Sequence, residues 1–244
     1  MRYMYKMTSE LTQSEIQSIL YILNAAFAGW GDETIFRWKF VENPQGESLH
    51  MLGYDGDEPI ATVGFWRNGP DDLLAYQCVD AAVSPSHQRR GIYQTALNGC
   101  SERLQGAYIY TFTSDNSRPA MMRCGWQLKR KIPLKFQWAP VVLRRYAKVD
   151  PISDVYAEWR FAKNPKMKYY ICRHKGLTFV LSKRREHLYV AGGVLSKDFG
   201  LPEVRPWMLF SYDFPELPLL MPRPNYYFIE NPCHRSYEEY IASH

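Results

Sequence analysis

The sequence lacks the features that mark several classes of protein. It contains no run of about 18 apolar residues, so no membrane-spanning helix is expected. Its first residues lack the apolar core of a signal peptide. The five cysteines are scattered and odd in number, they form no Cys-x-x-Cys pair, and their spacing is not that of a zinc site. We therefore expect a cytoplasmic protein with reduced thiols, no membrane association and no bound metal.

Charge and composition place the chain among folded globular proteins. Its net charge of +5 is modest, which suits an anionic ligand and is compatible with nucleic acid without requiring it. Hydrophobic residues make up 46% of the chain and charged residues 23%, so we expect a buried core and not a disordered chain. At 244 residues the chain is long enough for one large domain or two small ones.

One strand-to-helix corner has the composition of an anion site. Residues Tyr76–Val83 predict a strand, and a helix is predicted to begin near Arg89, after a proline turn. The first N–H groups of a helix lack internal partners and the helix dipole adds positive character, so such a corner attracts phosphate. Gly91 permits close approach to the backbone, and Arg89 and Arg90 add charge. The residues alone indicate an anion, with a pyrophosphate as one candidate.

The same corner carries a family resemblance. Residues 88–93 read Gln-Arg-Arg-Gly-Ile-Tyr, which resembles the acyl-CoA-binding signature Gln/Arg-x-x-Gly-x-Gly/Ala of the GNAT superfamily of N-acetyltransferases. Val83-x-Pro85 before it and the pair Gly125-Trp126 after it also resemble the family pattern. Tyr93 departs from that pattern, because most members have Gly or Ala there. A motif with an aromatic residue at this position resembles that of a bacterial subgroup of the family. The resemblance covers roughly residues 1 to 138.

The resemblance implies an α+β (mixed α/β) architecture, the GNAT acyl-CoA N-acyltransferase fold, with a central, mostly antiparallel, twisted sheet flanked by helices. The patterns of apolar residues and turn residues predict the same order of elements. Strands are expected at 2–7, 48–54, 59–67, 76–83, 107–112 and 126–138, and helices at 12–27, 32–40, 89–104 and 118–124.

An internal echo predicts a second, related half. The residues Trp38-Lys-Phe40 and Asn43-Pro44 recur in the same order as Trp159-Arg-Phe161 and Asn164-Pro165, at an offset of 121 residues. Self-similarity at a long fixed offset indicates duplication of a domain. We expect a catalytic, acetyl-CoA-binding GNAT domain at 1–140 and a degenerate GNAT-like domain at 145–244, which lacks the phosphate corner. Residues 139–150 are expected to be a connection, and 226–229 a closing strand.

The resemblance also implies which residues meet acetyl-CoA, the expected acyl donor. The backbone of Ala81, Ala82 and Val83 would bind the pantetheine arm, and Ser114 and Asn116 would lie beside it. The pyrophosphate would be bound by Gln88, Arg89, Arg90, Gly91, Ile92 and Tyr93. Charged hydrogen bonds to phosphate are worth about 1.5–3 kcal/mol each, so the arginines should contribute visibly to affinity.

Fewer residues point to the groups that carry out acyl transfer. Asp80 is the only acidic residue of its strand and is the candidate catalytic residue, although simple alternation places it on the opposite face from Gln77 unless a bulge intervenes. Histone-type members of the family have a Glu that acts as a general base at the position of Gln77. The family's usual general acid is a Tyr, and this chain has Met121 at that position. Trp30 and Trp38 are expected to contact the acceptor. Catalysis would then rest chiefly on proximity.

The expected function is an acetyl-CoA-dependent N-acetyltransferase. It would transfer an acyl group to a primary amine of a small molecule by direct attack in a ternary complex, and the resemblance favours an amino sugar. Two alternatives stay open. One is an acyltransferase with a protein or nucleic-acid acceptor, and the other is a non-catalytic CoA-binding or interaction module, because the usual Glu and Tyr are missing.

Overall fold

The computed structural model describes residues 1–69, 73–113, 115–213 and 225–231. Its contacts divide the chain into two compact units. Unit 1 comprises Met1–Arg130 together with the segment that begins at Tyr227, and unit 2 comprises Lys131–Tyr226. Among the described residues, no helix is long and apolar enough to cross a membrane.

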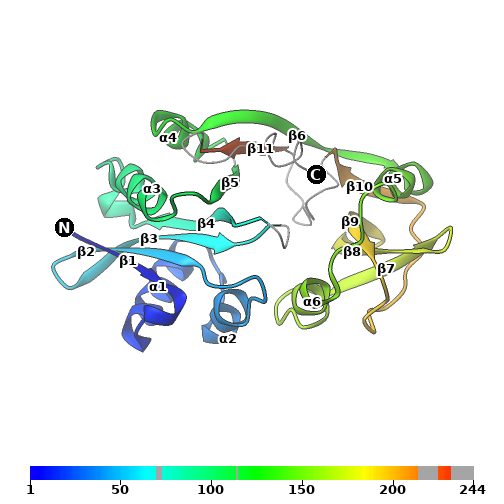
Figure 1. Cartoon of the computed structure of the whole chain (residues 1–244), viewed down its shortest axis with the longest axis horizontal. Helices are drawn as coiled ribbons and strands as arrows, with labels where there is room; N and C mark the ends of the chain where they lie inside the picture. Colours follow the sequence, from blue (N-terminus) through cyan, green and yellow to red (C-terminus); the bar gives the residue numbers. More distant parts are fainter. Residues whose placement is uncertain (70–72, 114, 214–224, 232–244) are drawn as a thin grey trace. The chain divides into compact units, whose positions relative to one another are not determined.

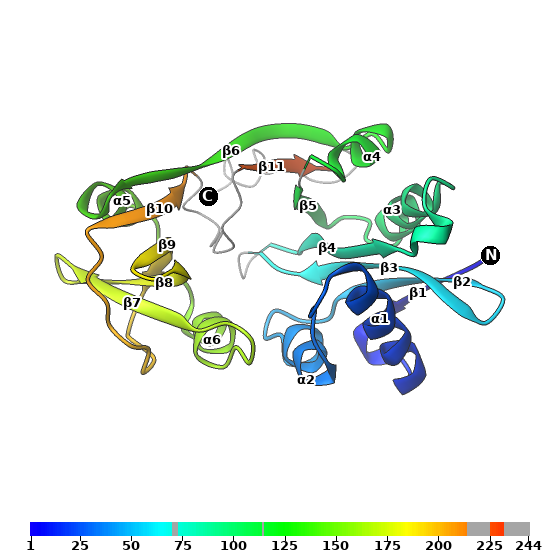
Figure 2. The same cartoon turned by 180° about the vertical axis from the view of Figure 1, so that it is seen from behind.

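Unit 1 is a sheet with helices on both faces. Its elements are β1 (Arg2–Met7), α1 (Gln13–Ala26), α2 (Glu33–Phe36), β2 (Leu49–Asp55), β3 (Glu58–Arg67), β4 (Ala75–Val83), α3 (Ile92–Arg103), β5 (Tyr108–Thr113), α4 (Arg118–Arg123) and β11 (Asn225–Glu230). The strands lie in the order β1-β2-β3-β4-β5-β11, and all pairs are antiparallel except β4 with β5. Figures 1 and 2 show α1 and α2 on one face of β1–β4 and α3 on the other.

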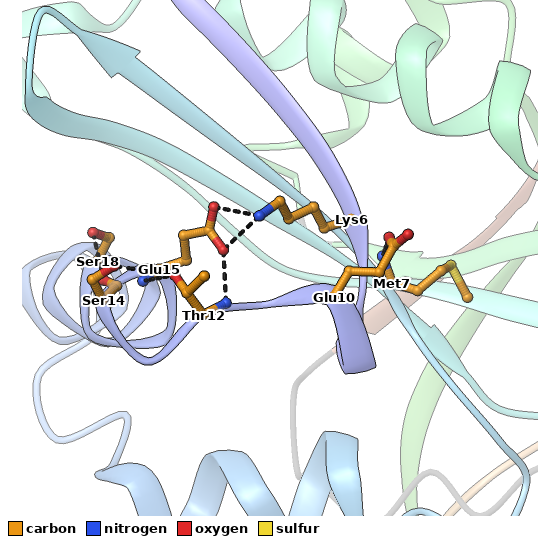
Figure 3. A network of polar contacts seen from close by, with 7 residues as sticks. All are labelled: Lys6, Met7, Glu10, Thr12, Ser14, Glu15 and Ser18. Carbon is orange, nitrogen blue, oxygen red and sulfur yellow. Dashed lines mark hydrogen bonds and ion pairs between the residues drawn. The ribbon is translucent and has the colours of Figure 1, made fainter.

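The start of α1 is fixed by a capping box and an ion pair, which Figure 3 shows from close by. The Glu15 backbone N–H donates to Thr12 Oγ1 at 3.3 Å, and the Thr12 N–H donates to Glu15 Oε2 at 2.8 Å. Lys6 Nζ lies 2.7 and 2.8 Å from the two carboxylate oxygens of Glu15, which ties the helix to β1. Burial raises the pKa of Glu15, but the hydrogen bonds from Lys6 and Thr12 outweigh it and the net pKa is lowered.

The helix expected at 32–40 is interrupted by a π-helical turn. After α2 the chain forms η2 (Arg37–Val41), in which the Glu42 N–H donates to the Arg37 carbonyl, five residues back, at 2.9 Å. In unit 2, α6 (Asp154–Ala157) is followed by a second π-helical turn, η4 (Glu158–Ala162), closed by Lys163 N–H and the Glu158 carbonyl at 2.9 Å. The two turns fall on the two copies of the sequence echo.

The echo continues into the loop after each turn. Asn43 Oδ1 accepts the Gln45 N–H at 3.1 Å, and Asn164 Oδ1 accepts the Lys166 N–H at 3.0 Å. Since π-helical residues make up well under 1% of globular proteins, their recurrence at both copies supports the proposal that the two halves arose by duplication.

Unit 2 has its own sheet. Its further elements are α5 (Ala139–Tyr146), β7 (Tyr169–His174), β8 (Leu177–Arg185), β9 (Leu188–Leu195) and β10 (Met208–Tyr212), and β6 (Gln127–Trp138) enters it from unit 1. The order β6-β10-β9-β8-β7 contains one parallel pair, β9 with β10. Helix α5 was expected to be a connection. Its Val142, Leu143 and Tyr146 recur at helical spacing and are buried, which is why the segment is helical.

The closing strands of the two halves are exchanged, which corrects the sequence prediction. Residues 126–138 were expected to close the first domain and 226–229 the second. Instead, β11 runs antiparallel to β5, with Tyr227 opposite Thr113, and β6 pairs through 134–138 with β10. The expected division at 1–140 and 145–244 therefore does not coincide with the compact units, because a strand pattern does not name the partner strand.

Candidate functional site

A bulge in β4 turns one carboxylate out of the regular alternation. Thr62 of β3 lies opposite Ala82 and Gly64 lies opposite Val79, so β4 holds one residue more than β3 between these pairs. Asp80 occupies the bulge with φ of 49°, a left-handed conformation that Asp adopts more readily than most residues. The sequence did not determine whether this strand has a bulge, and in the structure the bulge is present.

Beside the bulge, β4 separates from β5. The two strands pair from Ala75 with Tyr108 to Gln77 with Tyr110, and Thr111 Oγ1 donates to the Cys78 carbonyl at 2.9 Å. Beyond Gln77, no further β4–β5 register pair is formed among the residues that the structure describes. The expected pantetheine residues, Ala81, Ala82 and Val83, lie on this separated part of β4, where backbone groups that would bond a neighbouring strand face the opening.

The corner after β4 has the backbone of an anion cradle. A short 3₁₀ turn at Pro85–His87 leads to Arg89, with φ of 64°, and to Gly91, with φ of 77°, which is the N-cap of α3. Two left-handed residues so close together turn the backbone sharply before α3 begins. A Cβ atom at Gly91 would meet only Gln94 Oε1, at 3.8 Å, so the backbone there is open to a ligand.

Side-chain contacts that the sequence did not predict hold this corner. His87 is 8% exposed; its Nδ1 lies 2.8 Å from Ser86 Oγ, and its Nε2 lies 3.2 Å from Asp55 Oδ2 in the β2–β3 turn. Gln88 Nε2 donates to the Val83 carbonyl at 3.2 Å. Asp55-Gly56 is a sequence typical of a hairpin turn, but a turn sequence does not indicate which side chain will contact it.

The predicted phosphate residues divide into exposed and buried ones. The side chains of Arg89 and Arg90 are exposed beside the corner, whereas Ile92 is buried, so only its backbone can reach a ligand. Tyr93 is partly buried against the core and shares a side-chain hydrogen bond with Cys78. Burial raises the pKa of Tyr93 well above its usual value and that of Cys78 to about 12, so both stay neutral.

On the face of the sheet that carries α1 and α2, Asp80 meets two partners. Trp30 Nε1 donates to Asp80 Oδ1 at 3.0 Å, and Lys39 Nζ lies 2.6 Å from Oδ2. The Lys39 ammonium also lies 5.9, 5.2 and 5.3 Å from the ring centroids of Trp30, Phe40 and Trp66. Two residues chosen from the sequence, Asp80 and Trp30, are therefore brought together, and Lys39 was missed.

Other expected residues lie elsewhere. Trp38 is 7% exposed and belongs to the core, and Asn116 is an exposed turn residue. Ser114 lies outside the described residues. The Gln77 side chain is engaged, because Asn68 Nδ2 donates to its Oε1 at 2.8 Å. No three His, Cys, Asp or Glu side chains gather as metal ligands in the described part of the chain.

Comparisons with known proteins agree with this fold. Residues 16–126 match the sequence model of the acetyltransferase (GNAT) family, and no curated protein matches the chain. A GCN5-related N-acetyltransferase from Kribbella flavida is 12% identical with a TM-score of 0.53, over 93% of this chain and 71% of that one. Another from Anabaena variabilis is 11% identical with a TM-score of 0.53, over 94% and 72%. A provisionally assigned acetyltransferase from Pyrococcus horikoshii is 11% identical with a TM-score of 0.55, over 93% and 88%.

Proposed function

We propose that this chain, whose residues 16–126 match the acetyltransferase (GNAT) family model, transfers the acetyl group of acetyl-CoA to a primary amine of a small molecule. An amino sugar is the acceptor class favoured by the bacterial subgroup that its motif resembles. The amine nitrogen attacks the thioester carbonyl directly in a ternary complex, the C–N bond forms, the C–S bond breaks, and the proton lost by the amine ends on the CoA thiol.

The observation that carries the proposal is the corner between β4 and α3. Arg89 and Gly91 have left-handed backbones, a Cβ at Gly91 would meet only Gln94 Oε1, at 3.8 Å, and the Arg89 and Arg90 side chains are exposed beside it. The helix dipole, the free N–H groups at the start of α3 and two guanidinium groups supply the charge and the donors that a pyrophosphate requires.

The opened edge of β4 supports the position of the thioester. With the pyrophosphate at the corner, an extended pantetheine arm would run back along Val83, Ala82 and Ala81 and exchange hydrogen bonds with their backbone. Its sulfur end would then lie near the bulge at Asp80, next to Trp30. Donor and acceptor would thus meet where β4 has left β5, and much of the rate would come from holding the two in contact.

The first test is binding of acetyl-CoA to the full chain by isothermal titration calorimetry. In the double variant Arg89→Ala/Arg90→Ala we expect affinity to fall roughly 10-fold to 100-fold per charged hydrogen bond lost. The double variant Lys183→Ala/Arg185→Ala removes the same charge from exposed positions of β8 and is the matched control, with unchanged affinity. Equal affinities in the two double variants would show that the phosphate site is wrongly placed.

The second test identifies the acceptor. Release of CoA thiol is followed while amino sugars, polyamines, peptides and nucleic acid are offered in turn. Turnover with an amino sugar or another small amine supports the proposal. Turnover only with peptide or nucleic acid would replace it by a macromolecular acceptor. Binding of acetyl-CoA without turnover on any acceptor would identify a non-catalytic CoA-binding module.

A further inference from the structure

Lys39 is a cation enclosed by groups that complement its charge. Its Nζ lies 2.6 Å from Asp80 Oδ2, and the ring centroids of Trp30, Phe40 and Trp66 lie 5.2–5.9 Å away. The Lys39 and Asp80 side chains are only 17% and 16% exposed. A carboxylate and the negative faces of three aromatic rings together form a seat for one ammonium group.

Asp80 connects this seat to two other parts of unit 1. Its backbone forms the β4 bulge, and its Oδ1 accepts the Trp30 indole N–H at 3.0 Å. Trp30 belongs to the loop between α1 and α2, which is otherwise tied down through Asn24, whose Nδ2 donates to the Gly31 carbonyl at 2.7 Å and whose Oδ1 accepts the Gly31 N–H at 3.2 Å. One carboxylate thus joins the α1–α2 loop to the bulge.

We propose that Lys39 is a positioning residue that, by holding the Asp80 carboxylate, fixes Trp30 and the β4 bulge against one another. We name these three side chains the Lys39–Asp80–Trp30 latch. Asp80 then acts as a positioning group and not as the proton acceptor, since its two oxygens hold an ammonium group and an indole N–H. The consequence for acetyl transfer rests on the proposed function, whereas the latch itself does not.

The cation of the latch lies in the π-helical turn η2. The wider turn carries Trp38, Lys39 and Phe40 in sequence, with Trp38 and Phe40 buried, and Lys39 reaching the sheet between the rings. Trp66 Nε1 donates to the Lys39 carbonyl at 3.1 Å, so the backbone of the turn is anchored to β3 beside the seat. Position and charge of the ammonium group are both determined by described contacts.

The test restores the cation from solution. In Lys39→Ala we expect amide hydrogen exchange of residues 25–31 to rise by at least about tenfold, while exchange in α5 of unit 2 stays at the wild-type rate. Added n-butylammonium, which supplies an ammonium group on a short alkyl chain, should enter the seat and slow the exchange again. Lys39→Arg, which keeps the charge, should exchange at close to the wild-type rate.

Two further variants separate charge from packing. Lys39→Met keeps the aliphatic chain and loses the ammonium group; it should loosen the loop equally, and n-butylammonium should not rescue it. Lys39→Ala combined with Asp80→Asn should also resist rescue. Unchanged exchange of residues 25–31 in Lys39→Met, or rescue of Lys39→Met by n-butylammonium, would overturn the latch. A chain that shows the loosening and its rescue but does not bind acetyl-CoA would contradict the proposed function and leave the latch standing.

Discussion

The two units use the same block of structure and end it differently. In each, a short helix, a π-helical turn and an asparagine-capped loop lead into three antiparallel strands, and a fourth strand pairs in parallel with the third. In unit 1 the third strand, β4, is followed by the proposed phosphate corner and α3, whereas β9 of unit 2 reaches β10 through residues 196–207 without a described helix. The two units thus share a scaffold, and the proposed ligand site follows it only in unit 1.

The charged residues of the shared block also differ between the two units. Lys39 corresponds through the 121-residue offset to Arg160, and the bulge in β9 lies at Gly192 and Gly193, the latter with φ of 140°, so it carries no carboxylate. Burial lowers the pKa of Arg160, but its neighbours Tyr169 and Tyr156 outweigh this and raise it. Unit 2 thus keeps a cation at this position but pairs it with tyrosines. Among its described contacts, no carboxylate joins the β9 bulge to a preceding loop as Asp80 does in unit 1.

Replacing Asp80 by Gly makes the bulge of unit 1 resemble that of unit 2 and should have the largest effect on stability at neutral pH. Gly relieves the left-handed backbone at a gain of about 1 kcal/mol, but Lys39 loses the partner of a largely buried ion pair, which costs about 3–5 kcal/mol. We expect a net loss of about 2–4 kcal/mol in urea denaturation. Adding Lys39→Met should recover part of it, and a variant as stable as the wild type would contradict the pairing.

The glycines at the two special turns should separate binding from folding. Gly193→Ala places a Cβ 2.7 Å from Ile152 Cδ1 at φ of 140°, so we expect a loss of about 1–3 kcal/mol of stability with unchanged acetyl-CoA affinity. Gly91→Ala makes only an ordinary contact with Gln94 Oε1, at 3.8 Å, and we expect about 1 kcal/mol of strain together with at least about a tenfold loss of affinity. Denaturation and calorimetry on both variants check the pattern; a reversed pattern would place the ligand site in unit 2.

His50 should give unit 1 a pH dependence that its counterpart in unit 2, Ile171, cannot give. Burial lowers the pKa of His50 to about 3; the charge of Asp80 partly opposes this effect, and the charge of Lys39 adds to it. In the unfolded chain His50 binds a proton with a pKa near the ordinary value of about 6.5, whereas in the folded chain it does not. The free energy of unfolding therefore falls by about 1.4 kcal/mol for each unit by which the pH is lowered, between about pH 6.5 and 3. His50→Ile should remove this slope. The difference between the two denaturation curves isolates it from the carboxylates, and parallel curves would refute it.

The smallest effect is expected at the start of α1, which has a side-chain cap where α5 has none. Thr12→Ala removes the hydroxyl that accepts the Glu15 N–H and should cost about 1 kcal/mol in thermal or urea unfolding. Ser14→Ala, two residues further along the chain, is the control and should change stability by less. Equal losses would show that the cap contributes nothing beyond helix propensity.

Local features of the fold were predictable because they depend on neighbouring residues. The helix expected from residue 12 is present as α1, and the strand-to-helix corner expected around Gly91 joins β4 to α3. The latch was only half predictable: Asp80 and Trp30 were selected, but their contact depends on a bulge and on the reach of Lys39 from a π-helical turn, and neither follows from a 3.6-residue period. The exchange of β6 and β11 was not predictable at all, since strand periodicity carries no information on pairing.

The pairing of β11 with β5 has a consequence for how the protein is made. A ribosome releases β5 long before β11, and all of unit 2 is synthesised in between. Until Tyr227–Glu230 emerge, nascent unit 1 presents the edge of β5 without its native neighbour, and an open edge invites pairing with other chains. Completion of the unit that holds the phosphate corner is therefore a late event, and translation halted before residue 225 should yield chains that depend on chaperones.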